Sequence, residues 1–310
     1  MEKRKKISII LPVYFNEMNI EDTVNHLMLL PPQREDLDFE FVFVDDGSGD
    51  ASYQLLQSFQ DKHPDRIRLL KLTRNFGSMA AIQAGFSRCT GDYAGFIAAD
   101  LQDPPELFLE MLKILEAGKK VCLAIRSDRK DPFLQKSFAK AFYFLLRKFA
   151  LKGYPPGGFD FLLVKREVVD CINQVNEKNA NVMNLIFWMG YPYATIPYVR
   201  RAREKGMSKW TFGKRFKLFI DSFVGYSYFP VRFISISGIL FALSSFAYLT
   251  FIFINWLNGN IPVQGWTAMM MFIAFVSGTQ MLMLGILGEY LWRSLDESRK
   301  RPSFIIDEIS

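Results

Sequence analysis

The sequence lacks the residues and motifs that identify several common classes of protein. Cys89, Cys122 and Cys171 are the only cysteines among 310 residues, and their spacing does not match a metal site. Each lies in an apolar or helical context, so we expect reduced thiols in a cytosolic domain and no disulfide framework. The chain also has no nucleic-acid-binding module and neither glycine-rich phosphate loop, G-x-G-x-x-G or G-x-x-x-x-G-K-[ST]. Any phosphate-bearing ligand must therefore be bound in another way.

The N-terminus has no segment that suits a signal peptide. Residues 1–6 are basic, but the apolar run that follows covers only residues 7–13. We therefore expect the N-terminus to stay in the cytoplasm. The net charge of +6 accompanies Lys and Arg clusters beside long apolar runs, and half of the chain is hydrophobic. This combination favours an anionic membrane surface or an anionic substrate over nucleic acid.

Apolar runs alternate with helical patterns through the first half of the chain. We expect strands at residues 7–13, 39–44, 67–73, 93–98 and 120–125, with helices at residues 20–30, 51–62, 78–88 and 107–117. Another apolar strand follows Asp160, and residues 193–199 are expected to form an edge strand. This alternation predicts an α/β fold with a mostly parallel sheet between layers of helices.

Acidic residues follow two of these strands. Asp45 and Asp46 end the strand at residues 39–44, while Asp100, Gln102 and Asp103 follow the run at residues 93–98. Ligands of parallel α/β sheets bind at the carboxyl ends of the strands. Carboxylates there accept hydrogen bonds from ribose hydroxyls and base N–H groups, and coordinate a metal that bridges a diphosphate. The alternative for Asp103 alone is an N-cap of the next helix.

Four ordered motifs resemble the family-2 glycosyltransferases of GT-A fold, especially the polyprenyl-phosphate glycosyltransferases related to dolichol-phosphate mannose synthase. These motifs are Leu11-Pro12-Val13-Tyr14-Phe15-Asn16-Glu17, Val44-Asp45-Asp46-Gly47-Ser48, Arg74-Asn75-Phe76-Gly77 and Asp100-Leu101-Gln102-Asp103-Pro104-Pro105-Glu106. The resemblance covers nearly the whole chain. It implies a nucleotide diphosphate sugar as donor and a polyprenyl phosphate lipid as acceptor.

The resemblance also implies roles for particular residues. The expected nucleotide-binding residues are Pro12, Tyr14, Glu17, Asp46 and Asp100, and the expected ligands of Mg²⁺ or Mn²⁺ are Asp100 and Gln102. Asp160 is the expected catalytic residue, with hydrogen bonds to the backbone of its own loop as the alternative. The phosphate-binding residues expected from the resemblance are Arg200, Arg203, Ser208 and Lys209, with a solvated loop at residues 200–210 as the alternative. Arg126 and Arg129 are also expected to contact a phosphate, because they precede a basic, aromatic segment expected at the membrane interface beside the site. The chain departs from the family at Ala98, where relatives commonly have an Asp.

The second half of the chain carries membrane signals. Residues 131–151 and 212–229 are basic and aromatic, which is typical of interfacial helices, although the first also suits a packed surface helix. Residues 233–256 and 266–288 contain no charge and are long enough to span a bilayer. Lys and Arg flank this pair and are absent from the loop between, which predicts that both termini are cytoplasmic. Gly278, Gly285 and Gly288 would allow close helix approach, within or between subunits of a homo-oligomer.

The sequence therefore predicts four regions and one activity. The regions are a cytosolic GT-A domain at residues 1–210, juxtamembrane amphipathic helices at 211–232, two transmembrane helices at 233–292 and a cytoplasmic tail at 293–310. The expected activity is inverting transfer of a hexose, with glucose from UDP-glucose foremost, to undecaprenyl phosphate at the cytoplasmic face of the inner membrane. A membrane polysaccharide synthase and a non-catalytic membrane scaffold are the alternatives. The absence of a Gln-x-x-Arg-Trp segment argues against the synthase.

Overall fold

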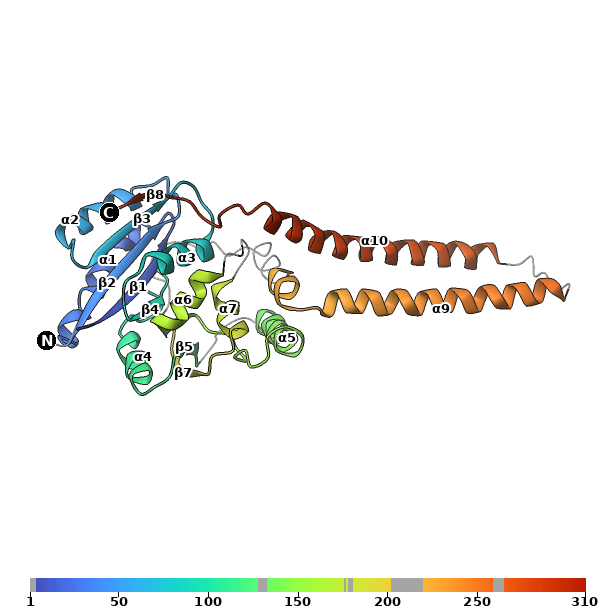
Figure 1. Ribbon diagram of the computed structural model, residues 1–310, viewed down its shortest axis with the longest axis horizontal. Helices are drawn as coiled ribbons and strands as arrows, with labels where there is room; N and C mark the ends of the chain where they lie inside the picture. Colours follow the sequence, from blue (N-terminus) through green and yellow to red (C-terminus); the bar gives the residue numbers. More distant parts are fainter. Residues whose placement is uncertain (1–3, 128–132, 176, 178–180, 202–219, 259–264) are drawn as a thin grey trace. The chain divides into compact units, whose positions relative to one another are not determined.

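The computed structural model describes residues 4–127, 133–175, 177, 181–201, 220–258 and 265–310. Two units divide the chain (Figure 1). The first comprises Met1–Phe219 with Pro302–Ser310, and the second comprises Ile220–Arg301.

The first unit is built on one eight-stranded sheet with the order β7-β5-β6-β4-β1-β2-β3-β8. Its strands are β1 (Lys5–Val13), β2 (Leu37–Asp45), β3 (Ile67–Leu72), β4 (Tyr93–Phe96), β5 (Val121–Arg126), β6 (Phe161–Lys165), β7 (Tyr193–Tyr198) and β8 (Ile306–Ile309). Its helices are α1 (Glu17–Leu27), the 3₁₀ turn η1 (Pro31–Gln33), α2 (Ser52–Lys62), α3 (Ser78–Arg88), α4 (Leu107–Glu116), α5 (Phe133–Phe149), α6 (Arg166–Gln174) and α7 (Val182–Trp188).

The central strands carry the hydrophobic core. β1 pairs in parallel with both β2 and β4, and β2 pairs in parallel with β3. Ile9, Ile10, Phe41 and Phe43 are at most 1% exposed, because helices cover both faces of the sheet (Figure 1). Such two-sided burial requires continuous apolar strands rather than alternating ones. The predicted α/β fold with a mostly parallel sheet is confirmed.

One antiparallel strand changes which loops meet at the carboxyl edge of the sheet. β6 lies between β4 and β5 and runs antiparallel to both. The loop before β6 therefore reaches the same edge as the loops after β4 and β5. β7 lies at the end of the sheet in parallel with β5, as the sequence predicted for an edge strand, and its Tyr198 is in register with Arg126.

The C-terminal strand β8 was not foreseen, because the tail was expected only to lie in the cytoplasm. β8 pairs antiparallel with β3 and closes the other end of the sheet. The Tyr53 hydroxyl donates to Glu308 at 2.7 Å, and Lys71 Nζ lies 3.1 Å from the same carboxylate. Burial, with the Glu308 hydrogen bond, raises the pKa of Tyr53 to about 12. Residues that follow the second long helix thus form part of the first unit.

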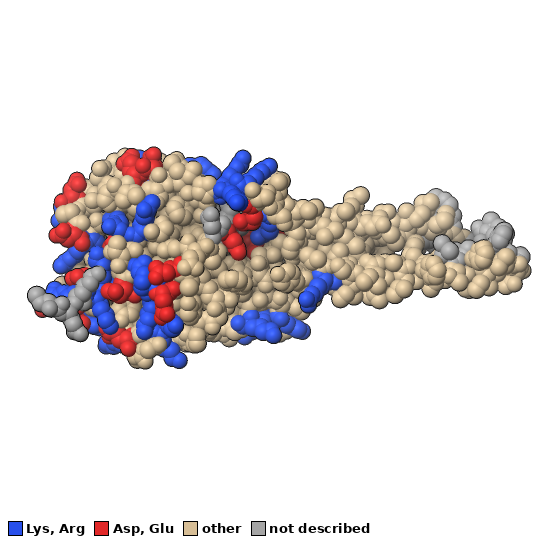
Figure 2. Space-filling view, in the orientation of Figure 1, with Lys and Arg blue, Asp and Glu red and all other residues tan. Residues whose placement is uncertain are grey.

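The second unit contains two long apolar helices, α9 (Phe229–Leu257) and α10 (Trp266–Ser298). Their segments Phe229–Asn255 and Met269–Ser298 are long and apolar enough to cross a membrane. On the face that Figure 2 shows, most of the side chains of the two helices are uncharged. Where charge resumes, Arg293 pairs with Asp221 at 2.5 Å and with Glu289 at 3.2 Å. This ion-pair cluster ties the base of α10 to the segment that precedes α9.

Candidate functional site

Two aspartates at the end of β2 organise the loops around them. Asp46 is 2% exposed, and its two carboxylate oxygens accept hydrogen bonds from the backbone N–H groups of Phe76 (2.7 Å) and Gly77 (2.9 Å). Asp45 accepts from the N–H group of Ser48 at 3.2 Å. Burial raises the pKa of each carboxyl, and these hydrogen bonds oppose the rise. The pair therefore fixes the turn after β2, and Asp46 joins it to the loop after β3.

Gly47 is required where these loops meet. Its φ of +69° lies in the left-handed region, and a Cβ there would approach the backbone carbon of Arg74 to 2.6 Å. A larger residue would meet both backbone strain and a clash with main-chain atoms. The Arg74 guanidinium lies 4.1 Å from the centroid of the Phe76 ring, so the loop after β3 presents a cation on an aromatic face.

The predicted nucleoside residues after β1 lie beside the turn after β2. Tyr14 is 38% exposed, and the Glu17 carboxylate accepts from the N–H group of Ala51 at 3.0 Å. Phe15, at a φ of +50°, donates its N–H group to Ser48 Oγ at 3.0 Å. The turns after β1 and β2 are thus joined directly. The structure brings Glu17 and Asp46 to adjacent loops, as expected for a site that spans two neighbouring strands.

The loop after β4 carries the predicted metal ligands in a constrained backbone. Asp100 accepts from the N–H group of Gln102 at 3.3 Å, and Leu101 between them has a φ of +56°. Asn16 donates its side-chain amide to the carbonyl oxygen of Ala99. The contact with Asn16 links this loop to the turn after β1. Backbone held in a sparsely populated region often marks a functional loop.

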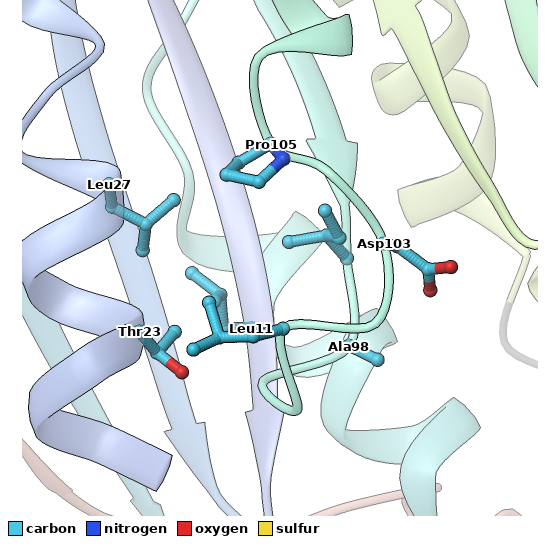
Figure 3. Close-up of a pocket in the computed structure, with 8 residues that line it drawn as sticks. Leu11, Thr23, Leu27, Ala98, Asp103 and Pro105 are labelled. Carbon is cyan, nitrogen blue, oxygen red and sulfur yellow. The ribbon is translucent and has the colours of Figure 1, made fainter. Parts of the chain in front are cut away.

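An apolar recess lies behind the same loop (Figure 3). Leu11, Thr23 and Leu27 contribute to its lining from β1 and α1, and Ala98 and Asp103 contribute from the loop after β4. Figure 3 shows the carboxylate of Asp103 turned away from the recess. The loop after β4 thus contributes apolar atoms to the lining of the recess, while the carboxylate of Asp103 faces the other way.

Asp103 does not cap α4, so the N-cap alternative is wrong. The N-cap residue of α4 is Glu106, whereas Asp103 is 3% exposed and accepts from the Tyr198 hydroxyl at 2.5 Å. Arg200 lies beside it, with Nε 3.1 Å from Asp103 and Nη2 3.9 Å from Asp100. Burial raises the pKa of Asp103, and the charge of Arg200 opposes the rise. One arginine thus lies between the two carboxylates of the loop.

Asp160 is paired with an arginine rather than with its own loop. Arg126 contacts both oxygens of the carboxylate, with Nε at 2.7 Å and Nη2 at 2.5 Å, and the Tyr198 hydroxyl lies 2.8 Å from one of them. The side chain of Asp160 is 13% exposed. Burial is the largest single influence on Arg126 and disfavours its charge, but the hydrogen bonds and charges of Asp160 and Tyr198 together outweigh it, so the pKa of Arg126 is raised. The pairing is the two-point geometry that holds both groups in fixed orientation.

The structure joins some of the expected phosphate-binding residues to the acidic site. Arg126 and Arg200 lie against Asp160 and Asp103 respectively. The other predicted phosphate-binding residues, Arg129, Arg203, Ser208 and Lys209, lie outside the described residues.

Sequence reasoning missed two residues that connect these loops. Tyr198 lies two positions before Arg200 at the end of a predicted edge strand, and that position was its only signal. Asn16 lies inside the first family motif, between two residues that were singled out. The contacts of each are long-range, with Asp103 for Tyr198 and with Ala99 for Asn16.

Comparison with known proteins gives consistent results. Residues 8–172 match the model of glycosyl transferase family 2. A bactoprenol glucosyl transferase of Shigella phage SfV is 34% identical over 97% of this chain and 98% of its own length. The uncharacterized glycosyltransferase YkcC of Bacillus subtilis is 34% identical over 99% of this chain and 95% of its own length.

A solved structure shows the same fold. The mannosyltransferase PcManGT from Pyrobaculum calidifontis, in complex with GDP-Man and Mn²⁺, matches with a TM-score of 0.50 and 19% identity over 71% of this chain and 64% of that chain. This likeness agrees with the GT-A fold that the motifs predicted. The chain belongs to glycosyl transferase family 2 and is a glycosyltransferase.

Proposed function

We propose that this protein transfers glucose from UDP-glucose to a polyprenyl phosphate, with undecaprenyl phosphate as the acceptor, at the cytoplasmic face of a membrane. Relatives named bactoprenol glucosyl transferase align with it over nearly their full length. The alignment includes the two long apolar helices, which suit a lipid acceptor. The family membership alone supports sugar transfer but leaves both substrates open.

One observation carries the proposal. Carboxylates and guanidinium groups from the ends of four strands meet at one edge of the sheet, namely Asp100 and Asp103 after β4, Arg126 on β5, Asp160 before β6 and Arg200 after β7. Acidic groups there suit a cation and sugar hydroxyls, whereas arginines suit phosphates. A donor diphosphate and an acceptor phosphate both need the second kind of group. The site therefore has the chemistry for two phosphate-bearing substrates.

The donor nucleoside would lie over the joined turns after β1 and β2. Pro12 is in register with Val44 on β2, and Tyr14 is an exposed ring at the end of β1. Glu17 and Asp46 supply carboxylate oxygens for ribose hydroxyls and base N–H groups. Because hydrogen bonds of Ser48 and Ala51 link these turns, binding would require little reorganisation.

A divalent cation fits the loop after β4, with Asp100 and Gln102 as its protein ligands. The described residues contain no cluster of three or more His, Cys, Asp or Glu that could hold a metal, and Ala98 supplies no oxygen. Mg²⁺ is often held by one or two carboxylates together with substrate phosphates. Arg200 lies beside Asp100 and Asp103, which indicates that the carboxylates of this loop favour positive charge next to them. A bound cation would neutralise charge on the leaving diphosphate.

Asp160 would orient the acceptor rather than remove a proton from it. A phosphate acceptor is already anionic at neutral pH, so its oxygen needs no general base. The two-point pairing of Asp160 with Arg126 places a guanidinium next to the acidic group, where it can also contact a phosphate. The acceptor oxygen would attack the anomeric carbon on the side opposite the leaving nucleotide. A single displacement of this kind inverts the anomeric configuration.

Two observations support a membrane arrangement with both termini in the cytoplasm. Lys and Arg flank the two long helices and are absent between them, which favours cytoplasmic termini. The pairing of β8 with β3 supports the same conclusion, because the C-terminus must lie on the side of the membrane where the sheet is. A reporter fused after Ser310 should therefore be cytoplasmic, and one inserted at Asn258 should be exported. Export of the C-terminal reporter would contradict this topology.

The substitution Asp100→Asn tests the proposed reaction. Asparagine keeps the shape of the side chain but removes its charge, so transfer of labelled glucose from UDP-glucose to undecaprenyl phosphate should fall more than about 100-fold, with the donor bound weakly. Asp92→Asn is the matched control, because Asp92 lies at the other end of β4, where it accepts from the N–H group of Lys6. It should transfer at the wild-type rate.

Two outcomes would contradict the proposal. An Asp100→Asn enzyme as active as wild type would remove the loop after β4 from the reaction. Wild-type protein that transfers no sugar from any nucleotide donor, although folded, would favour the non-catalytic scaffold.

Relatives commonly have an Asp where this chain has Ala98, so one carboxylate ligand is missing from the proposed metal site. Metal binding should therefore depend on the bound nucleotide of the donor. Titration calorimetry of Mn²⁺ should show at least about tenfold tighter binding when UDP is saturating, since the diphosphate then completes the coordination. The variant Ala98→Asp should bind Mn²⁺ more tightly than wild type in the absence of UDP. Equal Mn²⁺ affinity with and without UDP would rule out a donor-dependent site.

A further inference from the structure

Tyr198 is fixed in place by both its backbone and its ring. It is the last residue of β7, and its carbonyl oxygen accepts from the N–H group (2.9 Å) and the hydroxyl (3.0 Å) of Ser127. The side chain is 5% exposed, and its ring packs edge-on against Phe161 with centroids 5.5 Å apart. Because Phe161 immediately follows Asp160, this packing places the hydroxyl beside the start of β6.

The hydroxyl contacts carboxylates from two different loops. Its oxygen lies 2.5 Å from Asp103, in the loop after β4, and 2.8 Å from Asp160, in the loop before β6. A hydroxyl has one proton to donate, so only one carboxylate receives it at a time. The negative charge is compensated from both sides, by Arg200 next to Asp103 and by Arg126 next to Asp160. Tyr198 is therefore the point where two ion pairs are joined.

The two joined loops have different tasks in the transfer proposed above. The loop of Asp103 also carries Asp100 and Gln102, the proposed metal ligands on the donor side. Asp160 and Arg126 are the proposed acceptor-side groups. The distance between donor and acceptor groups therefore depends on what holds these loops together, and the structure gives Tyr198 direct hydrogen-bonding contact with both.

We propose that Tyr198 is a positioning residue whose hydroxyl sets the separation of the donor loop after β4 from the acceptor-side pair of Asp160 and Arg126. The inference rests on the proposed function. Removal of the hydroxyl leaves the Arg126–Asp160 pair, the Ser127 hydrogen bonds and the ring packing intact, so the fold and the nucleotide site are retained. The substitution removes the alignment of the donor loop with the acceptor-side pair. A displacement of about 1 Å between reacting groups can cost about 100-fold in rate.

The test compares Tyr198→Phe with Tyr193→Phe in the full chain. Tyr193 lies on the same strand, and its hydroxyl donates to the carbonyl oxygen of Gly153 at 2.6 Å, so this control also loses one tyrosine hydrogen bond. For each protein, kcat and the acceptor KM are measured in the glucose-transfer assay, and UDP affinity in the presence of Mn²⁺ is measured by calorimetry. Thermal unfolding is followed for all three proteins.

Tyr198→Phe should lower kcat by about 10- to 100-fold, with UDP affinity within about twofold of wild type. Its melting temperature should fall by no more than a few degrees, because Asp103 loses one donor but keeps Arg200 beside it. Tyr193→Phe should match wild type in kcat and UDP affinity. A wild-type kcat for Tyr198→Phe would overturn the inference and leave the proposed function standing. Loss of UDP affinity together with a larger fall in melting temperature would also overturn it, because the role would then be structural. Wild-type protein without transfer activity would refute the proposed function, and this inference with it.

Discussion

Carboxylates that gather in a partly buried space repel one another unless each has a compensating donor or cation. This constraint shapes the carboxyl edge of the sheet. Arg126 holds both oxygens of Asp160, Arg200 lies beside Asp103, and backbone N–H groups hold Asp46. The Tyr198 hydroxyl then joins the first two of these pairs. Compensation of this kind allows acidic and basic groups to lie side by side, as the proposed transfer between two phosphate-bearing substrates requires.

Sheet topology decides which groups can meet in this way. Six strands run in the same direction, and their carboxyl ends supply loops to one edge, namely β1, β2, β3, β4, β5 and β7. Asp160 joins them from the amino end of its strand because β6 is antiparallel between β4 and β5. At the far end of the sheet, β8 ties the residues after α10 to the catalytic unit. The pairing of Asp160 with Arg126 and the C-terminal connection thus both depend on antiparallel strands.

The features predictable from the sequence were those set by local pattern. Apolar strands followed by acidic motifs predicted that Asp46 and Asp100 lie at the ends of strands. Long uncharged runs predicted the helices α9 and α10. Contacts between distant segments were not predictable. Asp103 in its local context resembles a helix cap, yet it is bound by Tyr198, 95 residues later in the chain. The strand Ile306–Ile309 is only four residues long with three exposed positions, and such a segment has no hydrophobic pattern of its own. Its partner on β3 determines its conformation.

The stereochemistry of the product tests most directly whether the nucleotide sugar and the lipid phosphate react together at the carboxyl edge of the sheet. A site that aligns the acceptor phosphate opposite the leaving nucleotide permits a single displacement, so the α-linked glucose of UDP-glucose should become β-linked to the lipid phosphate. Nuclear magnetic resonance of the purified glucosyl lipid gives the coupling constant of the anomeric proton and distinguishes the two forms. A β-linked product agrees with direct attack of the acceptor phosphate on the sugar at the carboxyl edge of the sheet. An α-linked product would contradict it and would require a second displacement through an intermediate.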